Sequence, residues 1–289
     1  MKKGGKIIYY GLIVVFALVF LGSAVYIGDY LINSKQEGDL YDDLANKVPI
    51  VSRPIPGISQ TQPSVGEDDP TQGSVPEEEQ PTAGATQPEE VTSPTVEGGM
   101  LREYAEIYAM NNHTVGWIYI EGTKVNYPVV QSPERPDYYL NHNFEKKWSP
   151  WGAIYVRESC DVNLPSDNVT IYGHHMKDSS MFASLDRYKY RENWEAQPYV
   201  YFDTLYEHHV YQIFAAFKTS ANVGEGFAYH QFEDAANAEE FNEFIQVIKD
   251  LSFYDTGITP EYGDKIICLS TCEYTLNNGR FVVVAVRLD

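Results

Sequence analysis

An uncharged apolar run near the N-terminus constrains this chain more than any other feature. Lys2, Lys3 and Lys6 precede a mostly apolar stretch over residues 7–27. About 20 such residues cross a bilayer as a helix, and flanking lysines stay on the cytoplasmic side. We therefore expect residues 1–30 to be a single-pass membrane anchor, with the N-terminus cytoplasmic and the rest of the chain extracellular. A cleaved signal peptide is the alternative, although its apolar core normally holds about 7–15 residues; a buried core helix fits the lysines poorly.

A second segment, residues 31–99, separates this run from the globular part. Residues 52–99 hold nine acids and one base among many Pro, Gly, Ser and Thr. Such a composition buries too little apolar surface to offset its ordering entropy, so we expect an extended, acidic, Pro-rich linker. The sequence leaves open whether residues 30–50 continue the membrane helix or form a short helix beside the membrane. The whole chain has a net charge of −20, so nucleic acid is not an expected partner.

Residues 100–289 have the composition of a globular, mostly β domain. Short apolar runs bounded by turn residues predict strands at 116–120, 125–130, 152–156, 168–172, 199–202, 209–217, 265–271 and 280–288. Many short strands of this kind are typical of a barrel or a sandwich. Two helices interrupt them, a lead-in at 101–110 and a second helix at 237–251.

The second helix has a clear start and a clear buried face. Asn237 and Glu240 resemble a capping box, which marks a helix N-terminus. One apolar stripe follows at helical spacing, and we expect it to pack against the sheet rather than to bind a ligand. The stripe consists of Phe241, Phe244, Ile245 and Ile248.

The chain has three cysteines, an odd number that excludes a fully paired disulfide framework. They are Cys160, Cys268 and Cys272, and their spacing matches no zinc-binding motif. On one extended strand, Cys268 and Cys272 would lie about 13 Å apart, which is beyond the reach of a disulfide. A lone buried cysteine is usually a small core residue. Cys272 differs because it ends an apolar run.

Cys272 is expected to face an arginine across the last hairpin. Asn278 and Gly279 predict a turn between the last two strands, so Cys272 ends one strand and Arg280 begins its neighbour. Opposed residues of an antiparallel pair have Cβ atoms about 5 Å apart. A cation near a thiol favours the nucleophilic thiolate, and a guanidinium can stabilise an oxyanion. The register, which the sequence does not give, decides whether both side chains face the same way.

Acyl transfer by such a thiol also needs a proton donor for the leaving amine. Among seven histidines, His174 is the best candidate, since it follows the predicted strand at 168–172 and a turn-permitting Gly173. The adjacent His175 would point elsewhere on an extended backbone. His174, Cys272 and Arg280 together therefore form the candidate catalytic set.

These residues resemble the sortase family. The resemblance rests on "NVTIYGHHM" at 168–176, on "MF" at 181–182, and on "LSTC" at 269–272 with an arginine eight residues further on. Sortases are membrane-anchored cysteine transpeptidases of Gram-positive bacteria. The similarity covers roughly residues 100–289, and the two helices make class B the most similar. It implies a closed β-barrel of about eight strands, with no cofactor and no metal.

Carried over by position, the resemblance implies a role for each site residue. His174 is the catalytic histidine, Cys272 the nucleophile and Arg280 the catalytic arginine. Ser270 and Glu273 flank the nucleophile in the substrate groove, and the backbone N–H of Glu273 joins Arg280 at the oxyanion. The family motif reads Thr-Leu-x-Thr-Cys, and this chain has a cysteine at its first position.

The implied reaction is cleavage of a C-terminal sorting signal on secreted proteins, with transfer of the acyl group to an amine of a lipid-linked peptidoglycan precursor. The sorting signal is either Asn-Pro-x-Thr-Asn-like or Ser/Pro-Pro-x-Thr-Gly-like, and the wall amine is open. An L,D-transpeptidase is a rival enzyme class, but it carries Ser-His-Gly-Cys where this chain has Leu-Ser-Thr-Cys. Papain-like proteases place the cysteine before the histidine. A catalytically inactive surface-binding module is the alternative from a different class.

Overall fold

The computed structural model describes residues 3–49, 55, 95–96 and 98–288, with the side chains of residues 3–8 left out. Most of the linker expected over residues 31–99 therefore lies outside the described residues. The elements, in chain order, are α1 (Lys3–Lys47), α2 (Arg102–Met110), β1 (Thr114–Tyr119), β2 (Asn126–Val130), β3 (Ile154–Val156), β4 (Asn168–Tyr172), α3 (Arg191–Ala196), β5 (Tyr199–Thr204), β6 (Val210–Ser220), α4 (Ala238–Leu251), β7 (Ile266–Glu273) and β8 (Gly279–Arg287).

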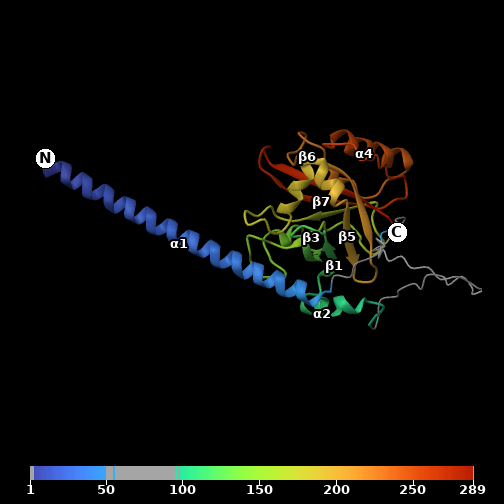
Figure 1. Cartoon of the computed structure of the whole chain (residues 1–289), viewed down its shortest axis with the longest axis horizontal. Coiled ribbons are helices and arrows are strands. Elements are labelled where there is room, and N and C mark those ends of the chain that lie inside the picture. Colours follow the sequence, from blue (N-terminus) through green and yellow to red (C-terminus); the bar gives the residue numbers. More distant parts are fainter. Residues whose placement is uncertain (1–2, 50–54, 56–94, 97, 289) are drawn as a thin grey trace, which may run out of the picture.

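The eight strands close into a barrel in the order β1-β2-β3-β4-β7-β8-β6-β5, and β5 pairs with β1 (Figure 1). Two of the pairs, β2 with β3 and β4 with β7, are parallel, and the others are antiparallel. All eight predicted strands are present within a few residues of their expected bounds, and the barrel, rather than the sandwich, is the correct choice.

Strand alternation divides β7 and β8 into an inner and an outer face, because successive side chains of a strand point to opposite sides. Ile267 and Leu269 belong to the core inside the barrel, as does Phe281 of β8. Cys268 and Val282 belong to a second buried cluster on the outer face. The inner face of this strand pair thus packs in the barrel core, and its outer face packs in the second cluster.

Helix α4 covers the outer face of this strand pair. Its stripe of Phe241, Phe244, Ile245 and Ile248 is buried in the outer cluster, as the sequence predicted. Asn237 caps the helix by accepting a hydrogen bond from the Glu240 N–H at 3.1 Å. Glu240 accepts in turn from the Ala236 N–H at 2.8 Å, so the reciprocal bond of the capping box falls one residue early. The segment before α4 adds the buried Tyr229 to the same cluster.

The turn between β7 and β8 lies where Asn278 and Gly279 predicted it. Five residues, 274–278, join the strands, and Asn278 alone among them has a positive φ, of 49°. Gly279 is needed for space rather than for its dihedral angles, since a Cβ there would lie 2.4 Å from the Glu273 carbonyl oxygen.

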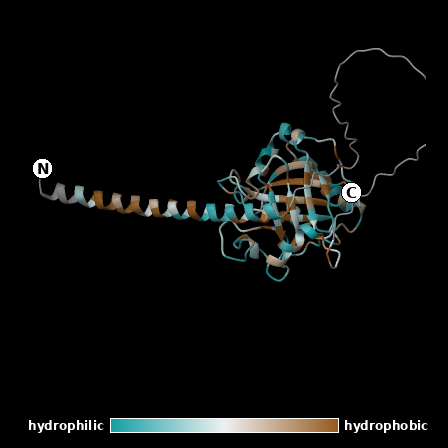
Figure 2. Ribbon diagram, turned by 60° about the horizontal axis from the view of Figure 1, so that its bottom comes forward, coloured by the Kyte–Doolittle hydropathy of each residue, from teal (hydrophilic) through white to brown (hydrophobic). Residues whose placement is uncertain are grey.

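Helix α1 is continuous from Lys3 to Lys47, which settles the open question about residues 30–50. Its side chains from Tyr9 to Ile27 are exposed, so this stretch is not a buried core helix. The helix is long and apolar enough to cross a bilayer. Figure 2 shows an apolar first half that projects from the domain and a more polar second half that lies against the barrel.

Candidate active site

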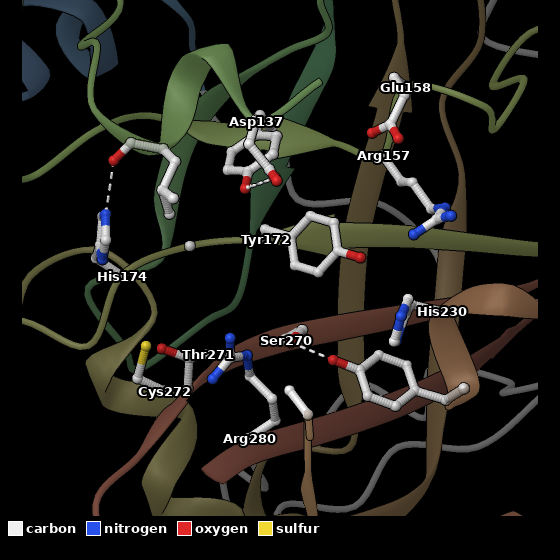
Figure 3. Close-up of a pocket in the computed structure, with 15 residues that line it drawn as sticks. Asp137, Arg157, Glu158, Tyr172, His174, His230, Ser270, Thr271, Cys272 and Arg280 are labelled. Atoms are coloured by element: carbon white, nitrogen blue, oxygen red, sulfur yellow. Dashed lines mark hydrogen bonds between the residues drawn. The ribbon is translucent and has the colours of Figure 1, made fainter. Parts of the chain in front are cut away.

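A pocket of about 270 Å³ opens on the outer side of the barrel, where the ends of β4 and β7 meet. His174 follows β4, Ser270 and Cys272 belong to β7, and Arg280 is the second residue of β8. All four of these residues line the pocket (Figure 3). The end of β4 therefore supplies an imidazole to the same cavity that receives a thiol from β7 and a guanidinium from β8.

Cys272 and Arg280 are directly opposed in the β7–β8 register, which the sequence could not give. Alternation places them on the outer face, the same side as Cys268 and Val282. The thiol of Cys272 is free and partly exposed. Both side chains thus face the pocket, and the pairing predicted from the sequence has the correct geometry.

The position of His174 is set by the close packing of Gly173. The Gly173 N–H donates to the Ser270 carbonyl oxygen at 3.0 Å and ties the end of β4 to β7. A Cβ at Gly173 would meet side-chain atoms of Ile154 at 2.6 Å and Phe182 at 2.7 Å. Glycine is required here because there is no room, not because the chain adopts a positive φ.

His174 Nε2 lies 2.7 Å from the carbonyl oxygen of Leu140. A carbonyl oxygen only accepts hydrogen bonds, so Nε2 must carry a proton. The bond fixes the orientation of the ring, and Figure 3 shows the imidazole on the same side of the pocket as the Cys272 sulfur. The neighbouring His175 points away, as expected, and its Nε2 lies 3.1 Å from Asp186 Oδ2.

Carbonyl groups of the β7–β8 turn hold Arg280 in place. Its Nη1 donates to Asn278 Oδ1 at 3.1 Å and to the Gly279 carbonyl oxygen at 3.0 Å. Figure 3 shows the guanidinium projecting into the pocket between Cys272 and Ser270. An orientation fixed through Nη1 suits a group that must present its remaining N–H donors to a substrate.

Ser270 lies in the floor of the pocket and is almost fully buried. Its hydroxyl is hydrogen-bonded to the Tyr229 hydroxyl at 2.6 Å. Burial raises the pKa of Tyr229, so this phenol stays neutral. Ser270 therefore lies in the same pocket as Cys272, but its hydroxyl already has a protein partner.

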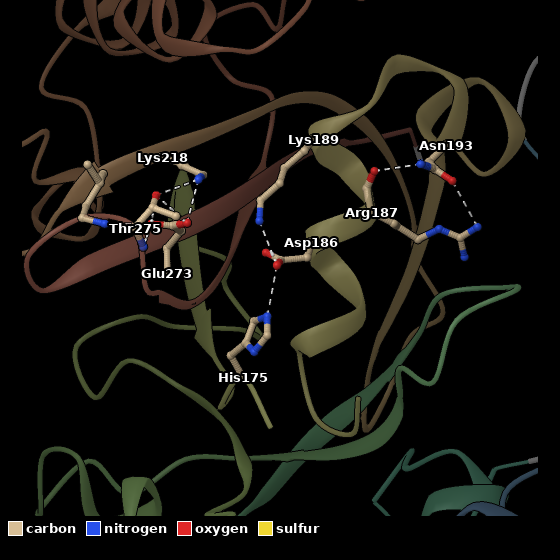
Figure 4. A network of polar contacts seen from close by, with 9 residues as sticks. His175, Asp186, Arg187, Lys189, Asn193, Lys218, Glu273 and Thr275 are labelled. Carbon is tan, nitrogen blue, oxygen red and sulfur yellow. Dashed lines mark hydrogen bonds and ion pairs between the residues drawn. The ribbon is translucent and has the colours of Figure 1, made fainter. Parts of the chain in front are cut away.

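The Glu273 side chain does not reach the groove where the sequence analysis expected it. By alternation it points to the side opposite Cys272, and it does not line the pocket. Lys218 Nζ lies 2.6 Å from Glu273 Oε1, and Thr275 donates to the same carboxylate through its N–H and hydroxyl at 2.8 Å (Figure 4). Burial disfavours the carboxylate, but the bonds from Lys218 and Thr275 together outweigh it and lower the pKa of Glu273 to about 2.

The wall of the pocket that faces the catalytic set was not predicted from the sequence. This wall includes Arg157, Glu158 and His230. Arg157 Nε donates to Glu233 Oε1 at 3.1 Å. Burial, and then the charges of Arg157 and Arg280, lower the pKa of His230. Arg157 and Glu158 directly follow β3, so the strand-end criterion that selected His174 applies to them as well.

The other two cysteines are buried and unsuited to nucleophilic chemistry. Burial raises the pKa of Cys160 to about 11 and also raises that of Cys268. Cys268 belongs to the outer core beneath α4, which agrees with a packing role for the residue that departs from the family motif. Cys272 is thus the one partly exposed thiol among the three.

Comparisons with known proteins agree with this geometry. A family model described as a sortase domain matches residues 118–288. The chain is 30% identical over 203 residues to sortase B of Listeria monocytogenes, covering 70% of this chain and 80% of that protein. The Staphylococcus aureus sortase B–substrate complex superposes with a TM-score of 0.60 at 29% identity, covering 66% of this chain and 87% of the other. A sortase B complexed with triglycine gives the same TM-score and identity, with 66% and 88% covered.

Proposed function

Because the chain belongs to the sortase family and is a class B cysteine transpeptidase, we propose that it cleaves a C-terminal sorting signal of secreted proteins and joins the new carboxyl end to a peptidoglycan-precursor amine. The observation that supports this most directly is the shared pocket of Cys272, Arg280 and His174. Among the structural neighbours, one is a complex with substrate and another a complex with triglycine. These fit a peptide donor and an amine acceptor.

Acylation begins when the Cys272 thiolate attacks the carbonyl carbon of the scissile peptide bond. The carbonyl oxygen becomes an oxyanion, which the Arg280 guanidinium and the Glu273 backbone N–H stabilise. The C–N bond then breaks, and protonated His174 gives its proton to the leaving amine. The product is a thioester between Cys272 and the new carboxyl end of the secreted protein.

Deacylation repeats these steps in reverse order with a different amine. The amine of a lipid-linked wall precursor attacks the thioester carbonyl, and neutral His174 takes its proton. The C–S bond breaks, an amide forms, and Cys272 leaves as the thiolate. This two-step scheme is supported by a thiol that is accessible from solvent and a cation fixed opposite it.

The anchor and the topology complete the proposal. The apolar half of α1 spans the cell membrane once, and the lysines before it remain in the cytoplasm. The barrel then lies outside the cell, where wall precursors and secreted substrates meet. A signal peptide cleaved after the apolar run would remove the anchor, so the mass of the mature protein tests this part of the proposal.

The thioester tests the chemistry. We would mix the full chain in detergent with a panel of candidate sorting pentapeptides and add hydroxylamine as the acceptor. Release of a peptide hydroxamate, together with mass-spectrometric detection of acylated Cys272, is the expected result. Cys272→Ala should abolish both signals, whereas Cys268→Ala, which removes a buried thiol outside the pocket, should retain them. Cleavage by Cys272→Ala would end the proposal.

A further inference from the structure

Helix α1 packs on the catalytic barrel as soon as it leaves its apolar stretch. Tyr41 and Leu44 are buried in the main core, and the Tyr41 hydroxyl donates to the Gly152 carbonyl oxygen at 2.9 Å. Ser34 Oγ donates to Asp178 Oδ2 at 2.7 Å. These contacts lie along one side of a continuous helix. The barrel is therefore attached to the helix that would span the membrane through a rigid element.

This attachment gives the barrel a defined height above the membrane. The uncharged run ends at Ile27, and an α-helix rises about 1.5 Å per residue, so α1 residues near Tyr30 lie within about 5 Å of that end along the helix axis. A cavity of about 410 Å³ is lined by Tyr26, Ile27 and Tyr30 of α1. Parts of the barrel that share this cavity must lie at the same height.

The barrel side of this cavity belongs to the active-site loops. It is lined by Pro150, by the loop residues His174, His175, Met176 and Lys177, and by Tyr274 of the β7–β8 turn. His174 also lines the catalytic pocket. The cavity at the end of the apolar run and the catalytic pocket are thus neighbours that share His174 in their walls.

Large exposed aromatic side chains surround this region. Trp148 is 72% exposed and Tyr274 is 73% exposed. Trp148 and Tyr26 line a neighbouring cavity on the same side of α1, and the Tyr274 hydroxyl donates to the His175 carbonyl oxygen at 3.0 Å. We name Trp148, Pro150, Met176 and Tyr274 the aromatic rim. Trp and Tyr are enriched at membrane–water interfaces, where one part of the ring system is apolar and the other is wet.

We propose that the aromatic rim docks on the phospholipid headgroups of the outer leaflet, so that the catalytic pocket opens at the membrane surface. This inference rests on the proposed membrane topology of α1. Its consequence is that both substrates approach along the membrane, since a sorting signal still held in the bilayer and a lipid-linked amine reach His174 and Cys272 at headgroup height. Figure 1 agrees, because the β7–β8 turn lies on the side of the barrel that faces the N-terminal half of α1.

The test measures the depth of one added tryptophan at a time on the full chain in nanodiscs of phosphatidylcholine and phosphatidylglycerol. A Trp148→Phe parent removes the exposed native indole, and its remaining emission, from Trp117, Trp151 and Trp194, is subtracted from that of each variant. Tyr274→Trp then reports on the rim, and Tyr108→Trp on α2 is the matched far-side control. Lys47 at the end of α1 pairs with Glu106 of α2 at 2.8 Å, which puts Tyr108 about 30 Å further along the α1 axis than Ile27. Lipids with a spin label near the headgroup serve as the quencher.

We expect Tyr274→Trp, and Trp148 in the native chain, to lose most of their emission to the quencher, while Tyr108→Trp changes little. Equal emission losses at residues 274 and 108, or none at either, would overturn the inference, as would failure of the chain to remain in the nanodisc. Inserting a Gly-Ser repeat after Gly28 should abolish quenching of the rim and leave cleavage of a soluble peptide intact. Peptide cleavage by the same samples tests the proposed function separately, because it does not require docking.

Discussion

At the nucleophile, strand alternation decides which side chains are used in the reaction and which stabilise the fold. Cys272 and Arg280 point outward to the pocket, and Glu273 points inward to Lys218. The two sides of this strand pair therefore have different roles, which substitutions can distinguish. A change at Arg280 should lower activity without loss of stability, whereas a change at Glu273 should lower stability first.

Arg280→Lys should lower kcat/KM for a sorting peptide by about 100-fold, the effect of removing one well-placed oxyanion donor. Lysine keeps the charge, but it lacks the planar fork that bonds to the turn and to the substrate at the same time. Steady-state cleavage of a fluorogenic peptide measures the change. Arg191→Lys, on the surface of α3, is the control and should be nearly neutral; a fully active Arg280→Lys variant would show that the guanidinium is dispensable.

Glu273→Gln should lower the free energy of unfolding at pH 7 by about 2 kcal/mol, since hydrogen bonds to a buried charged group are among the stronger ones. The pKa of Glu273 in the folded chain is about 2, below its value of about 4.3 in an unfolded chain. Its ionised form therefore stabilises the fold above about pH 4.3, and this contribution disappears as the pH falls toward 2. Urea denaturation should therefore show a smaller difference in the free energy of unfolding between the native chain and Glu273→Gln at pH 3 than at pH 7.

The exposed Glu243→Gln on α4 is the matched control for this change of charge. A deficit of Glu273→Gln that stays the same at both pH values would contradict the proposed ionisation of Glu273.

The positions of the catalytic residues follow from local signals, but their surroundings do not. Cys272 and Arg280 lie at the ends of apolar runs that could only be neighbouring strands, and His174 follows a third run. Once Cys272 is assigned to the outer face, period-two alternation also requires the Glu273 side chain to point inward, away from the pocket. His230 lies in a three-residue 3-10 helix before α4 (Tyr229–Gln231), which is too short to give a periodic pattern, so its place in the pocket could not be predicted.

Among the elements, α4 bears most directly on the pocket, because it covers the outer face of β7 and β8. The same outer face continues into the site at Cys272 and Arg280. The segment leading into α4 supplies Tyr229 to Ser270 and His230 to the pocket wall. The start of α4 therefore matters both for stability and for the position of that wall.

Asn237→Ala should lower the free energy of unfolding by about 1 kcal/mol, because it removes the N-cap acceptor of the Glu240 N–H. Asn237→Ser, which retains a capping oxygen, should lose much less. Urea denaturation monitored by tryptophan fluorescence measures both. Equal losses in the two variants would indicate that packing at Asn237, rather than its cap, is what matters.

The elements themselves could be predicted well because their periodicity is strong. The apolar stripe of α4 and the apolar runs of the strands indicate whether each element is a helix or a strand and which of its faces is buried. The docking of residues 30–47 of α1 on the barrel was not predicted. In that stretch two acidic residues separate Tyr41 from Leu44, so the sequence shows no continuous apolar stripe. The apolar run before it gives a much stronger signal, which is that of a membrane span.

For the molecule as a whole, the docked helix changes the role of the linker. An extended linker of the kind expected over residues 52–99 would by itself set how far the catalytic domain reaches from the membrane. The chain already packs on the barrel at Leu44 and Val48, before that segment begins, and Thr95, near the end of the segment, pairs with Leu101. In the proposed topology, α1 would therefore fix the separation of the pocket from the membrane, whatever the length of the linker.

This view predicts that the docked half of α1 stabilises the domain. A fragment of residues 100–289 should be less stable than one of residues 29–289, on the order of 4 kcal/mol, because Tyr41, Leu44 and Val48 leave the core. Urea denaturation compares the two, and a synthetic peptide of residues 29–49 should restore part of the loss. Replacing residues 56–94 by a Gly-Ser sequence of equal length, with α1 kept, should leave stability unchanged. Equal stability of the two fragments would mean that α1 contributes nothing to the core, and the domain would then be free to move relative to its anchor.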